Sequence, residues 1–505
     1  MKKFYVTTPI YYVNDRPHIG HAYTTIAADV LARWKRLKRE PVFFLTGTDE
    51  HGSKIAQAAE KHGASPEDYV DRLAGEFKSS WKGLNISNDD FIRTSEKRHA
   101  DVVRSVFNVL HEKGEIVKGF YEDWYCVSDE SFWLLSELAD GKCPSCGRAV
   151  EKLKEETYFF KLSNYENKLL DHYEKNPEFL SPPKRAKEII NFVRSGLRDL
   201  SVSRLKEKWG IPLPFDGRHT AYVWFDALLN YLTAAGYDPR DNRGNFETLW
   251  PADVHLVGKE IFRFHAVIWP AMLMALGLPL PKKVFAHGWW TVEGEKMSKS
   301  MGNFVDPGDI TKDFGVDALR YFLLREIPFG ADGDFSRDSL VARYNAELAN
   351  NLGNLFSRTL TLIEKNFGGV LKTRPEGVLR EKIREQTEKM VRAYERIAFS
   401  EILESLNLIV TETNRYIDQK APWNLVKSDL DQAERALSEC QPILRWLSAG
   451  FYPFMPASSA IMWKQIGEET DLLKEGWKIL QDPLAGFSPG KKLRKGAILF
   501  QRKGR

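Results

Sequence analysis

Two short polar segments of the chain could do phosphoryl chemistry. One is Pro17-His18-Ile19-Gly20-His21, near the start, and the other is Lys296-Met297-Ser298-Lys299-Ser300, far downstream. Preorganised cations stabilise the charge that develops on a pentacovalent α-phosphate and on departing pyrophosphate. We expect Lys299 to be the main cation and Lys296 to support it. Alone, the first segment is equally well explained as a turn with solvated histidines, and the second is better explained as an exposed loop with ordinary surface lysines. The pair in this order indicates activation of a substrate by ATP.

The first segment lies where a strand is expected to give way to a helix. Residues 4–13 are rich in Val, Ile, Tyr and Thr and predict a buried strand, and residues 20–38 predict the helix that follows. His18 and His21 would then lie at a helix N-terminus, where backbone N–H groups and the helix dipole favour a phosphate. Imidazoles there can also donate hydrogen bonds to phosphoryl oxygens.

Both segments match the hallmark motifs of the class I aminoacyl-tRNA synthetases, and the chain resembles that class. The resemblance is closest to the methionyl-tRNA synthetases and covers nearly the whole chain. Further matching segments are residues 7–14, 47–52, 222–227, 258–269 and 286–288. The resemblance implies that methionine is activated with ATP to methionyl-adenylate and pyrophosphate, and is then transferred to the terminal ribose of initiator and elongator tRNA. It also implies that ATP, with Mg²⁺, is bound by His18, Gly20, His21 and Lys299.

The resemblance also implies a methionine pocket made of aromatic and apolar side chains and one acid. Such groups suit a polarisable thioether, with a Tyr hydroxyl or a His nitrogen as a weak partner for sulfur. Asp49 matches the acid that holds the substrate ammonium. Without the resemblance, the aromatic residues would be explained as core and Asp49 as a turn or a helix cap. The matching positions are Ile10, Tyr12, Asp49, Trp224, Ala227, Leu228, Tyr231, Ile261, His265 and Trp269.

Three positions match the anticodon-binding residues of the same family. Asn354 and Arg358 are four residues apart and share a helix face, and Trp423 follows Lys420-Ala421-Pro422 at an expected helix entry. In single-stranded RNA an aromatic side chain can stack on a base, while Asn and Arg can bond base edges. The alternative is a solvated helix face for the first two and a core position for Trp423.

Three of the four cysteines are candidates for a zinc site. Cys143-Pro144-Ser145-Cys146-Gly147 is a turn that could present two thiolates to one ion, and Cys126 with Asp129 could complete a tetrahedron. The resembled family commonly has Cys at the position of Asp129, so a Cys126, Asp129, Cys143 and Cys146 set departs from its pattern. A metal-free knuckle is the alternative. A redox role is disfavoured because no thioredoxin-like βαβ pattern surrounds these cysteines.

The length of 505 residues predicts three or so domains, and the net charge of +4 leaves RNA binding to local basic patches. The fold class expected is α/β: a doubly wound, Rossmann-type parallel sheet with an inserted knuckle domain, followed by an α-helical bundle. A monomer in the cytoplasm is expected, because no leader, membrane span or appended RNA-binding barrel is recognised. The ranges are 1–115 and 218–290 for the catalytic halves, 116–217 for the insertion, 291–337 for a connecting unit, 338–488 for the bundle and 489–505 for a basic tail.

Other functions remain to be separated from this one. A sister synthetase for Leu, Ile, Val or Cys would share both motifs, although the insertion is too short for the large editing domain of the first three. The Cys enzyme would hold zinc at its amino-acid site. A small nucleotidylyltransferase would not need the bundle, and a pure RNA-binding module would lack exchange of pyrophosphate. Asp313-Phe314-Gly315 has no accompanying kinase loop, and no Walker glycine loop occurs.

Overall fold

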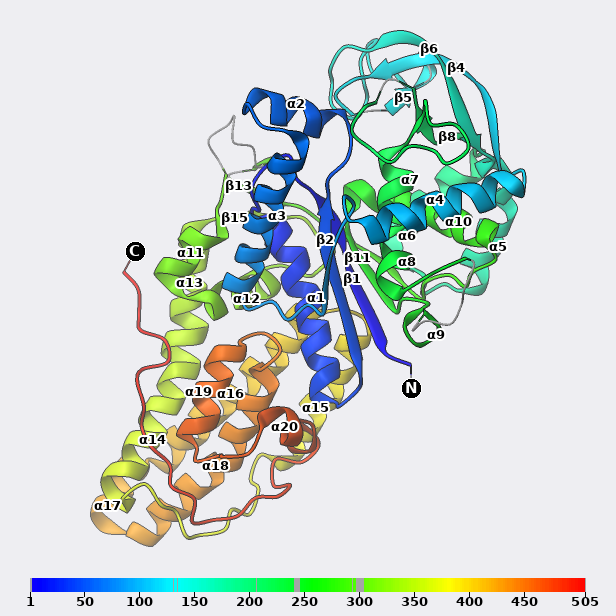
Figure 1. Ribbon diagram of the computed structural model, residues 1–505. Coiled ribbons are helices and arrows are strands. Elements are labelled where there is room, and N and C mark those ends of the chain that lie inside the picture. Colours follow the sequence, from blue (N-terminus) through cyan, green and yellow to red (C-terminus); the bar gives the residue numbers. More distant parts are fainter. Residues whose placement is uncertain are drawn as a thin grey trace. The chain divides into compact units, whose positions relative to one another are not determined.

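The structure is a computed structural model that describes residues 2–129, 131–133, 135–205, 207–239, 246–292, 294–296 and 304–504 (Figure 1). The chain divides into two compact units. Unit 1 comprises Met1–Arg16, Phe43–Ser79 and Asn88–Ala286, and unit 2 comprises Pro17–Val42, Ser80–Ser87 and His287–Arg505. Each unit is therefore assembled from segments that lie far apart in the sequence.

A parallel sheet forms the centre of unit 1, with strand order β3-β2-β1-β11-β12-β7. The pairs β1 with β11, β2 with β3 and β12 with β7 are parallel, which confirms the doubly wound class. All five residues of β11 are buried, as expected for a parallel strand covered on both faces. The strands are β1 (Phe4–Tyr12), β2 (Val42–Asp49), β3 (Asp90–Arg93), β7 (Leu180–Ser181), β11 (Val254–Gly258) and β12 (Val284–His287).

The range 116–217, expected as an insertion, also supplies β7 to this sheet. A strand of two residues is too short to show an alternating pattern, so it could not be predicted from the sequence. The remaining strands of the range form an antiparallel sheet of order β5-β4-β6-β8, in which β4 and β6 are a long pair (Figure 1). They are β4 (Ile116–Cys126), β5 (Ser131–Trp133), β6 (Glu151–Phe160) and β8 (Leu200–Ser201); β9 (Ser203–Arg204) and β10 (Thr220–Ala221) pair separately.

The helices associated with unit 1 connect these strands. Helices α4, α8 and α10 pack together, and α8 also contacts β3. One core cluster joins them through large buried side chains such as Phe107, Phe225 and Trp269. The helices are α2 (Ser53–Lys61), α3 (Pro66–Gly83), α4 (Lys97–Glu112), α5 (Glu166–Lys175), α6 (Pro183–Arg194), α7 (Val223–Leu228), α8 (Asn230–Ala235), α9 (Phe246–Leu249) and α10 (Trp269–Leu276).

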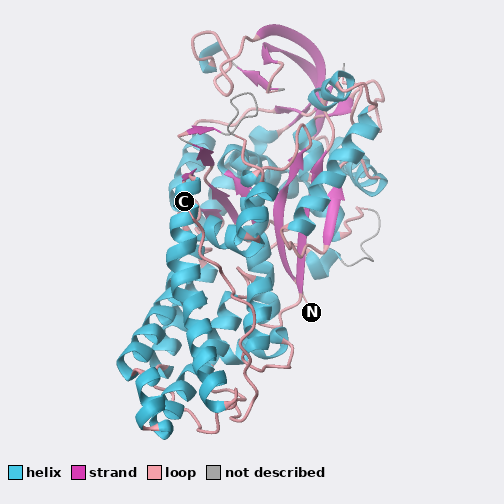
Figure 2. Cartoon of the chain, turned by 90° about the vertical axis from the view of Figure 1, so that its left-hand side faces the viewer, coloured by secondary structure: helices cyan, strands magenta, loops and turns pink. Residues whose placement is uncertain are grey.

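Unit 2 is largely helical among its described residues, as Figure 2 shows. Helix α1 (Ile19–Leu37) is buried along most of its length and contacts α12 and α20. A small sheet of order β14-β13-β15 contains β13 (Trp290–Val292), β14 (Glu295–Lys296) and β15 (Gly333–Phe335). The further helices are α11 (Pro307–Phe314), α12 (Val316–Arg325), α13 (Arg337–Arg343), α14 (Asn354–Phe367), α15 (Arg380–Glu395), α16 (Phe399–Lys420), α17 (Pro422–Ser428), α18 (Leu430–Phe451), α19 (Pro456–Gln465) and α20 (Leu472–Gln481).

The basic C-terminal segment lies against the helices of unit 2 (Figure 2). Phe500 is buried, and its ring centroid lies 6.1 Å from that of Tyr344. Asn345 accepts a hydrogen bond from the Lys503 N–H at 2.9 Å and donates one to its carbonyl at 2.9 Å. This segment is therefore docked by specific contacts.

Among the described residues, no helix combines the length and apolar character that a membrane span requires.

Candidate active site

The start of α1 presents the two histidines of the first motif. The His18 Nδ1 atom accepts a hydrogen bond from the Gly20 N–H at 3.0 Å, and the His21 Nδ1 atom accepts one from the His18 N–H at 3.2 Å. Because each Nδ1 atom is an acceptor, a neutral ring must carry its proton on Nε2. The two rings stack with centroids 3.8 Å apart. Burial, and then the neighbouring His18, hold the pKa of His21 well below its ordinary value, so His21 is neutral.

This geometry differs from the expected anion site at a helix N-terminus. The N–H groups of His18 and Gly20 are bonded to the two imidazoles, and that of Ile19 donates to the Val305 carbonyl at 3.2 Å. These three amides are therefore already used. The protonated Nε2 atoms of His18 and His21 are the donors that the motif can offer to a phosphoryl group.

The segment that follows the lysine loop lies against the same helix start. Phe304 contacts the His18 ring edge to face, with centroids 6.0 Å apart, and Val305 accepts the Ile19 N–H. On the other side of the loop, β14 ends at Lys296 and pairs with β13. Lys299 and the rest of 297–303 lie outside the described residues, and so does the Lys296 side chain. The residues that follow the second hallmark motif thus contact the first hallmark motif within unit 2.

Unit 1 places a hydrogen-bonded aromatic group among the expected methionine residues. The Tyr231 hydroxyl donates to His265 Nε2 at 2.7 Å, because His265 Nδ1 is engaged as the donor to the Ile261 carbonyl at 3.0 Å. Burial lowers the pKa of His265 to about 4, so its imidazole is neutral at neutral pH. The hydroxyl of a tyrosine and the ring of a neutral histidine are therefore hydrogen-bonded to each other in a buried environment.

Behind Tyr231, a second buried histidine fixes the aromatic rings. His255 Nε2 accepts from the Trp269 indole N–H at 3.2 Å, and His255 Nδ1 bonds the Thr7 hydroxyl at 2.7 Å. The Tyr231 ring lies 4.2 Å from the His255 ring, centroid to centroid. Burial, and then His265, hold the pKa of His255 well below its ordinary value. Tyr231 and Trp269 are consequently held in defined orientations.

The remaining pocket candidates surround this group to different degrees. Leu228, Tyr231 and Trp269 are buried members of one core cluster, and Ile10, Trp224 and Ile261 are partly buried and pack against it. Asp49 is the last residue of β2 and is 8% exposed, so it is neither a helix cap nor a turn residue. Tyr12 ends β1 and is half-buried, and Ala227 is buried in α7. The structure therefore leaves partly exposed surface at several of the predicted positions.

The knuckle brings its four candidate ligands together. The ligand atoms of Cys126, Asp129, Cys143 and Cys146 all lie within 4.8 Å of one another. Cys126 Sγ is 3.5 Å from Cys146 Sγ, and Cys143 Sγ is 2.9 Å from Asp129 Oδ2. Thiolates bound to one tetrahedral zinc ion are about 3.8 Å apart, so this group could hold a metal ion after a small adjustment.

The local turn explains how the knuckle is formed. The Gly147 N–H donates to the Cys143 carbonyl at 2.8 Å, and Gly147 has a φ of 69°, which favours glycine. Burial first, and then Asp129, raise the pKa of Cys143 to about 12. In the absence of an ion the Cys143 thiol is therefore protonated, and binding a metal would release its proton.

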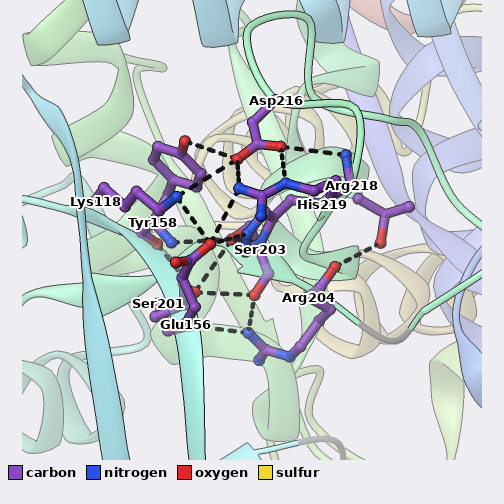
Figure 3. A network of polar contacts seen from close by, with 11 residues as sticks. Lys118, Glu156, Tyr158, Ser201, Ser203, Arg204, Asp216, Arg218 and His219 are labelled. Carbon is purple, nitrogen blue, oxygen red and sulfur yellow. Dashed lines mark hydrogen bonds and ion pairs between the residues drawn. The ribbon is translucent and has the colours of Figure 1, made fainter.

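A second group of metal-ligand types lies in unit 1 but is already neutralised by protein cations (Figure 3). Glu156, Asp216 and His219 converge there. Lys118 Nζ lies 2.8 Å from Glu156, and the Arg218 guanidinium lies 2.7 Å from Asp216. The pKa of Asp216 is lowered, above all by its hydrogen bond from Arg218. This group is a salt-bridge network rather than a metal site.

The anticodon candidates lie in unit 2. Asn354 begins α14 and is exposed, while Arg358 lies one turn later and is already bonded. Arg358 donates to Asp418 Oδ1 at 2.7 Å and to the Asn414 carbonyl and side-chain oxygens at 2.8 Å. Trp423 lies in the first turn of α17, next to Pro422, and is 38% exposed. Helices α14 and α17 contact each other.

Two residues of the site, Phe264 and Asp226, had no role in the sequence interpretation. Phe264 stacks on Trp224, with centroids 3.9 Å apart and a 9° angle between planes. Asp226 is buried between two histidines. Both residues are in the motif segments 222–227 and 258–269, but a linear pattern does not show which ring or carboxylate a side chain will meet.

Family models match almost the whole chain. The model described as tRNA synthetases class I (M) matches residues 4–153 and 136–360. The model described as the anticodon binding domain of methionyl tRNA ligase matches residues 368–503. A methionine–tRNA ligase from Caldanaerobacter subterraneus is 51% identical, over 99% of this chain and 79% of that protein. One from Rickettsia felis is 46% identical, over 99% of this chain and 98% of that protein.

Solved structures give the same result. Mycobacterium tuberculosis methionyl-tRNA synthetase in complex with methionyl-adenylate has a TM-score of 0.92 and 40% identity, and the alignment covers 99% of this chain and all of that one. The free form of the M. tuberculosis enzyme has a TM-score of 0.86 and 37% identity, with 100% and 99% covered. With motifs, fold and full-length relatives in agreement, the chain belongs to the methionyl-tRNA synthetase family of class I tRNA synthetases.

Proposed function

We propose that the protein is a methionine–tRNA ligase. It activates L-methionine with ATP to methionyl-adenylate and pyrophosphate, and then transfers the methionyl group to the 3′ end of its tRNA. The observation that supports this most directly is the contact of Phe304 and Val305, which follow the lysine loop, with the start of α1 at His18 and Ile19. The two parts that phosphoryl transfer needs are thereby held in one unit of a chain whose relatives are named for this reaction.

In the activation step, the methionine carboxylate attacks the α-phosphate. We assign His18 and His21 to donate from Nε2 to phosphoryl oxygens, and Lys299, with Lys296, to stabilise the charge on the phosphates. Gly20 serves through its backbone, since its N–H orients the His18 ring. ATP is expected to arrive as its Mg²⁺ complex, which lowers the charge on its phosphates. Positioning and electrostatics suffice, and no side chain forms a covalent intermediate.

For methionine, we assign the carboxylate of Asp49 to the substrate ammonium and the Tyr231–His265 pair to the sulfur end. The pair is neutral and weakly polar, which suits a thioether better than a charged group would. The aromatic rings of Tyr12, Trp224 and Trp269 would supply apolar contacts, and so would the aliphatic candidates Ile10, Ala227, Leu228 and Ile261.

In the transfer step, the tRNA would be recognised through its anticodon by Asn354, Arg358 and Trp423. The exposed indole of Trp423 can stack on a base, and Asn354 can bond a base edge. We also propose that the knuckle holds a structural Zn²⁺ through Cys126, Asp129, Cys143 and Cys146. A monomer acting in the cytoplasm on initiator and elongator tRNA completes the proposal.

Exchange of labelled pyrophosphate into ATP tests the activation step, with each of the twenty amino acids supplied singly. Exchange with methionine alone is expected. Exchange with another amino acid would assign a sister enzyme, and RNA binding without any exchange would indicate a binding module. Lys299→Ala is expected to slow methionine-dependent exchange by about 10²–10³-fold, the typical effect of losing one preorganised donor to a developing charge. An unchanged rate would contradict the role of Lys299.

Metal analysis tests the knuckle separately. About one zinc ion per chain is expected after purification without chelator, and Cys143→Ser should lose most of it. Cys440→Ser is the matched control, because Cys440 is buried in α18, away from the knuckle sequence. A zinc content that Cys143→Ser leaves unchanged would rule out this site.

A further inference from the structure

A buried carboxylate in unit 1 is clamped between two histidines. Asp226 is fully buried, and its Oδ2 atom lies 2.7 Å from His51 Nδ1, while its Oδ1 atom lies 2.7 Å from His99 Nε2. Each imidazole nitrogen must act as the donor, since an ionised carboxylate only accepts. Burial by itself would raise the pKa of Asp226, but His51 and His99 lower it to about 2, so the group is an anion.

The three residues belong to different elements that carry the methionine candidates. His51 lies two residues beyond Asp49, at the end of β2. Asp226 lies in α7, between Trp224 and Ala227. His99 lies in the first turn of α4 and reaches α8 as well, through a 3.1 Å hydrogen bond to Thr233. The clamp therefore ties together the end of β2, α7, α8 and α4.

Helix α7 needs such tertiary contacts because it is too short to be stable by itself. It has six residues, and its N-cap, Tyr222, makes no side-chain capping bond. A helix this short is marginal without tertiary contacts. The Asp226 carboxylate supplies two strong contacts, since hydrogen bonds to an ionised acceptor are about twice as strong as neutral ones.

The arrangement could also be viewed as an Asp–His dyad that activates a nucleophile. His51 lines a cavity of about 480 Å³ whose wall includes Ser95 and Trp209. However, the Ser95 hydroxyl donates to Glu50 Oε2 at 2.5 Å, so it is not directed at His51. The other hydroxyl of the described cavity wall, that of Thr94, accepts from the Glu50 N–H at 2.8 Å. A structural use of the carboxylate also explains both histidines rather than one.

We propose that Asp226 is a positioning residue for methionine. Through His51 it fixes α7, with Trp224 and Ala227, at a set distance from Asp49, and through His99 it fixes the same helix on α4. The residue that contacts the substrate ammonium and the residues that contact its apolar part are thereby kept in fixed positions relative to one another. This inference rests on the proposed function, because it takes these residues as the methionine pocket.

Asp226→Asn tests the inference. The variant keeps the shape of the side chain but replaces one acceptor by a donor, so that one histidine loses its partner. In pyrophosphate exchange the KM for methionine is expected to rise about 10- to 100-fold, the equivalent of one lost hydrogen bond to a charged group. The KM for ATP is expected to stay within about twofold, because the ATP residues are on other elements.

Glu439→Gln is the matched control. Glu439 is a buried carboxylate of α18 that accepts from the backbone N–H groups of Gly377 and Val378, and the substitution removes its charge in the same isosteric way. A loss of thermal stability with both KM values unchanged is expected. If Asp226→Asn, once shown to be folded by circular dichroism, raises both KM values equally or neither, the positioning role is wrong.

A second pair of variants decides the matter if Asp226→Asn does not fold. His99→Gln retains an N–H donor that can reach Asp226, whereas His99→Leu does not. The KM for methionine should rise more in His99→Leu than in His99→Gln, and equal values would overturn the inference. Failure of the proposed function is distinguishable, since the unaltered protein would then show no methionine-dependent exchange, and the inference would fall with it.

Discussion

A buried ion triad in unit 2 gives the sharpest stability prediction. Asp29 on α1 accepts from Arg33 Nε at 2.7 Å and from Arg320 Nη2 at 2.6 Å. Asp29 and Arg320 are fully buried and Arg33 is 7% exposed. The other N–H groups of Arg320 donate to the Phe454, Leu84 and Pro453 carbonyls. The triad thus joins α1, α12 and the turn between α18 and α19.

Asp29→Asn should destabilise the protein strongly. The change keeps the size of the side chain but removes the carboxylate that both buried guanidinium groups contact. Breaking a buried pair by removing one partner costs about 3–5 kcal/mol, since the remaining charge is not solvated. Burial works to raise the pKa of Asp29, but Arg320 and Arg33 hold it below its ordinary value. The stabilisation is therefore present above the unfolded-state pKa of Asp29 and is lost as the pH falls through the lower folded-state value.

Urea unfolding followed by circular dichroism at 222 nm measures the effect, because unit 2 is largely helical. Glu385→Gln is the control: its pair with Lys389 is 2.7 Å long, but the side chains are 58% and 50% exposed. That change should have little effect on the free energy of unfolding, because water already solvates both side chains of the pair. At neutral pH, a loss for Asp29→Asn no larger than that of the control would refute the reasoning. So would a difference from the unaltered protein that grows, rather than shrinks, on acidification.

Three further outcomes are expected. In a filter-binding assay, Trp423→Ala should weaken tRNA binding by about 5- to 150-fold, because about 1–3 kcal/mol of base stacking is lost. Trp423→Phe keeps an aromatic ring and should retain most of the affinity in that assay. Gly47→Ala should destabilise the fold by about 1–3 kcal/mol or more in urea unfolding, because the new Cβ would lie 2.0 Å from the Ile92 carbonyl oxygen. Gly75→Ala is the control: its Cβ would meet no atom within 4 Å, so the change should be neutral or stabilising. His265 has a pKa of about 4 in the folded protein, so below pH 6.5 the unfolded chain binds more protons than the folded one. The free energy of unfolding should therefore fall by up to about 3 kcal/mol between pH 6.5 and 4. His265→Gln should make this pH dependence less steep in urea unfolding measured at several pH values.

Elements with a strong local pattern were predictable from the sequence. The expected strand at 4–13 is β1 (Phe4–Tyr12), and the expected helix at 20–38 is α1 (Ile19–Leu37). The first is rich in β-branched and aromatic residues, and the second has apolar residues three and four apart, so each local sequence indicates its structure. The grouping of the knuckle ligands was also predictable, because the Cys143 to Gly147 turn fixes two of the four positions locally.

What the sequence did not show depends on contacts between distant residues. The strand β7 exists because its backbone pairs with β12, and its two residues have no pattern of their own. The first amides of α1 were expected to be available for a phosphate, but the imidazoles of the same motif and Val305 occupy them. The Asp226 clamp joins residues 51, 99 and 226, whose spacing carries no periodicity.

Unit 2 contains two arginine–aspartate pairs whose contributions to stability differ because their solvent exposure differs. The Arg358–Asp418 contact is 2.7 Å long, similar to the bonds to Asp29, but Arg358 is 22% and Asp418 is 60% exposed. An exposed pair contributes about 0–1 kcal/mol, because water and salt solvate each partner almost as well. The bond to Asp418 can therefore be given up at little cost, as the proposed contact of Arg358 with a base edge requires, while the bonds to Asn414 orient the guanidinium beforehand. Arg320 has no such alternative, since removing it from Asp29 leaves a buried charge. The partly exposed Arg358 is thus suited to the proposed recognition role, and the buried Arg320 to holding helices together.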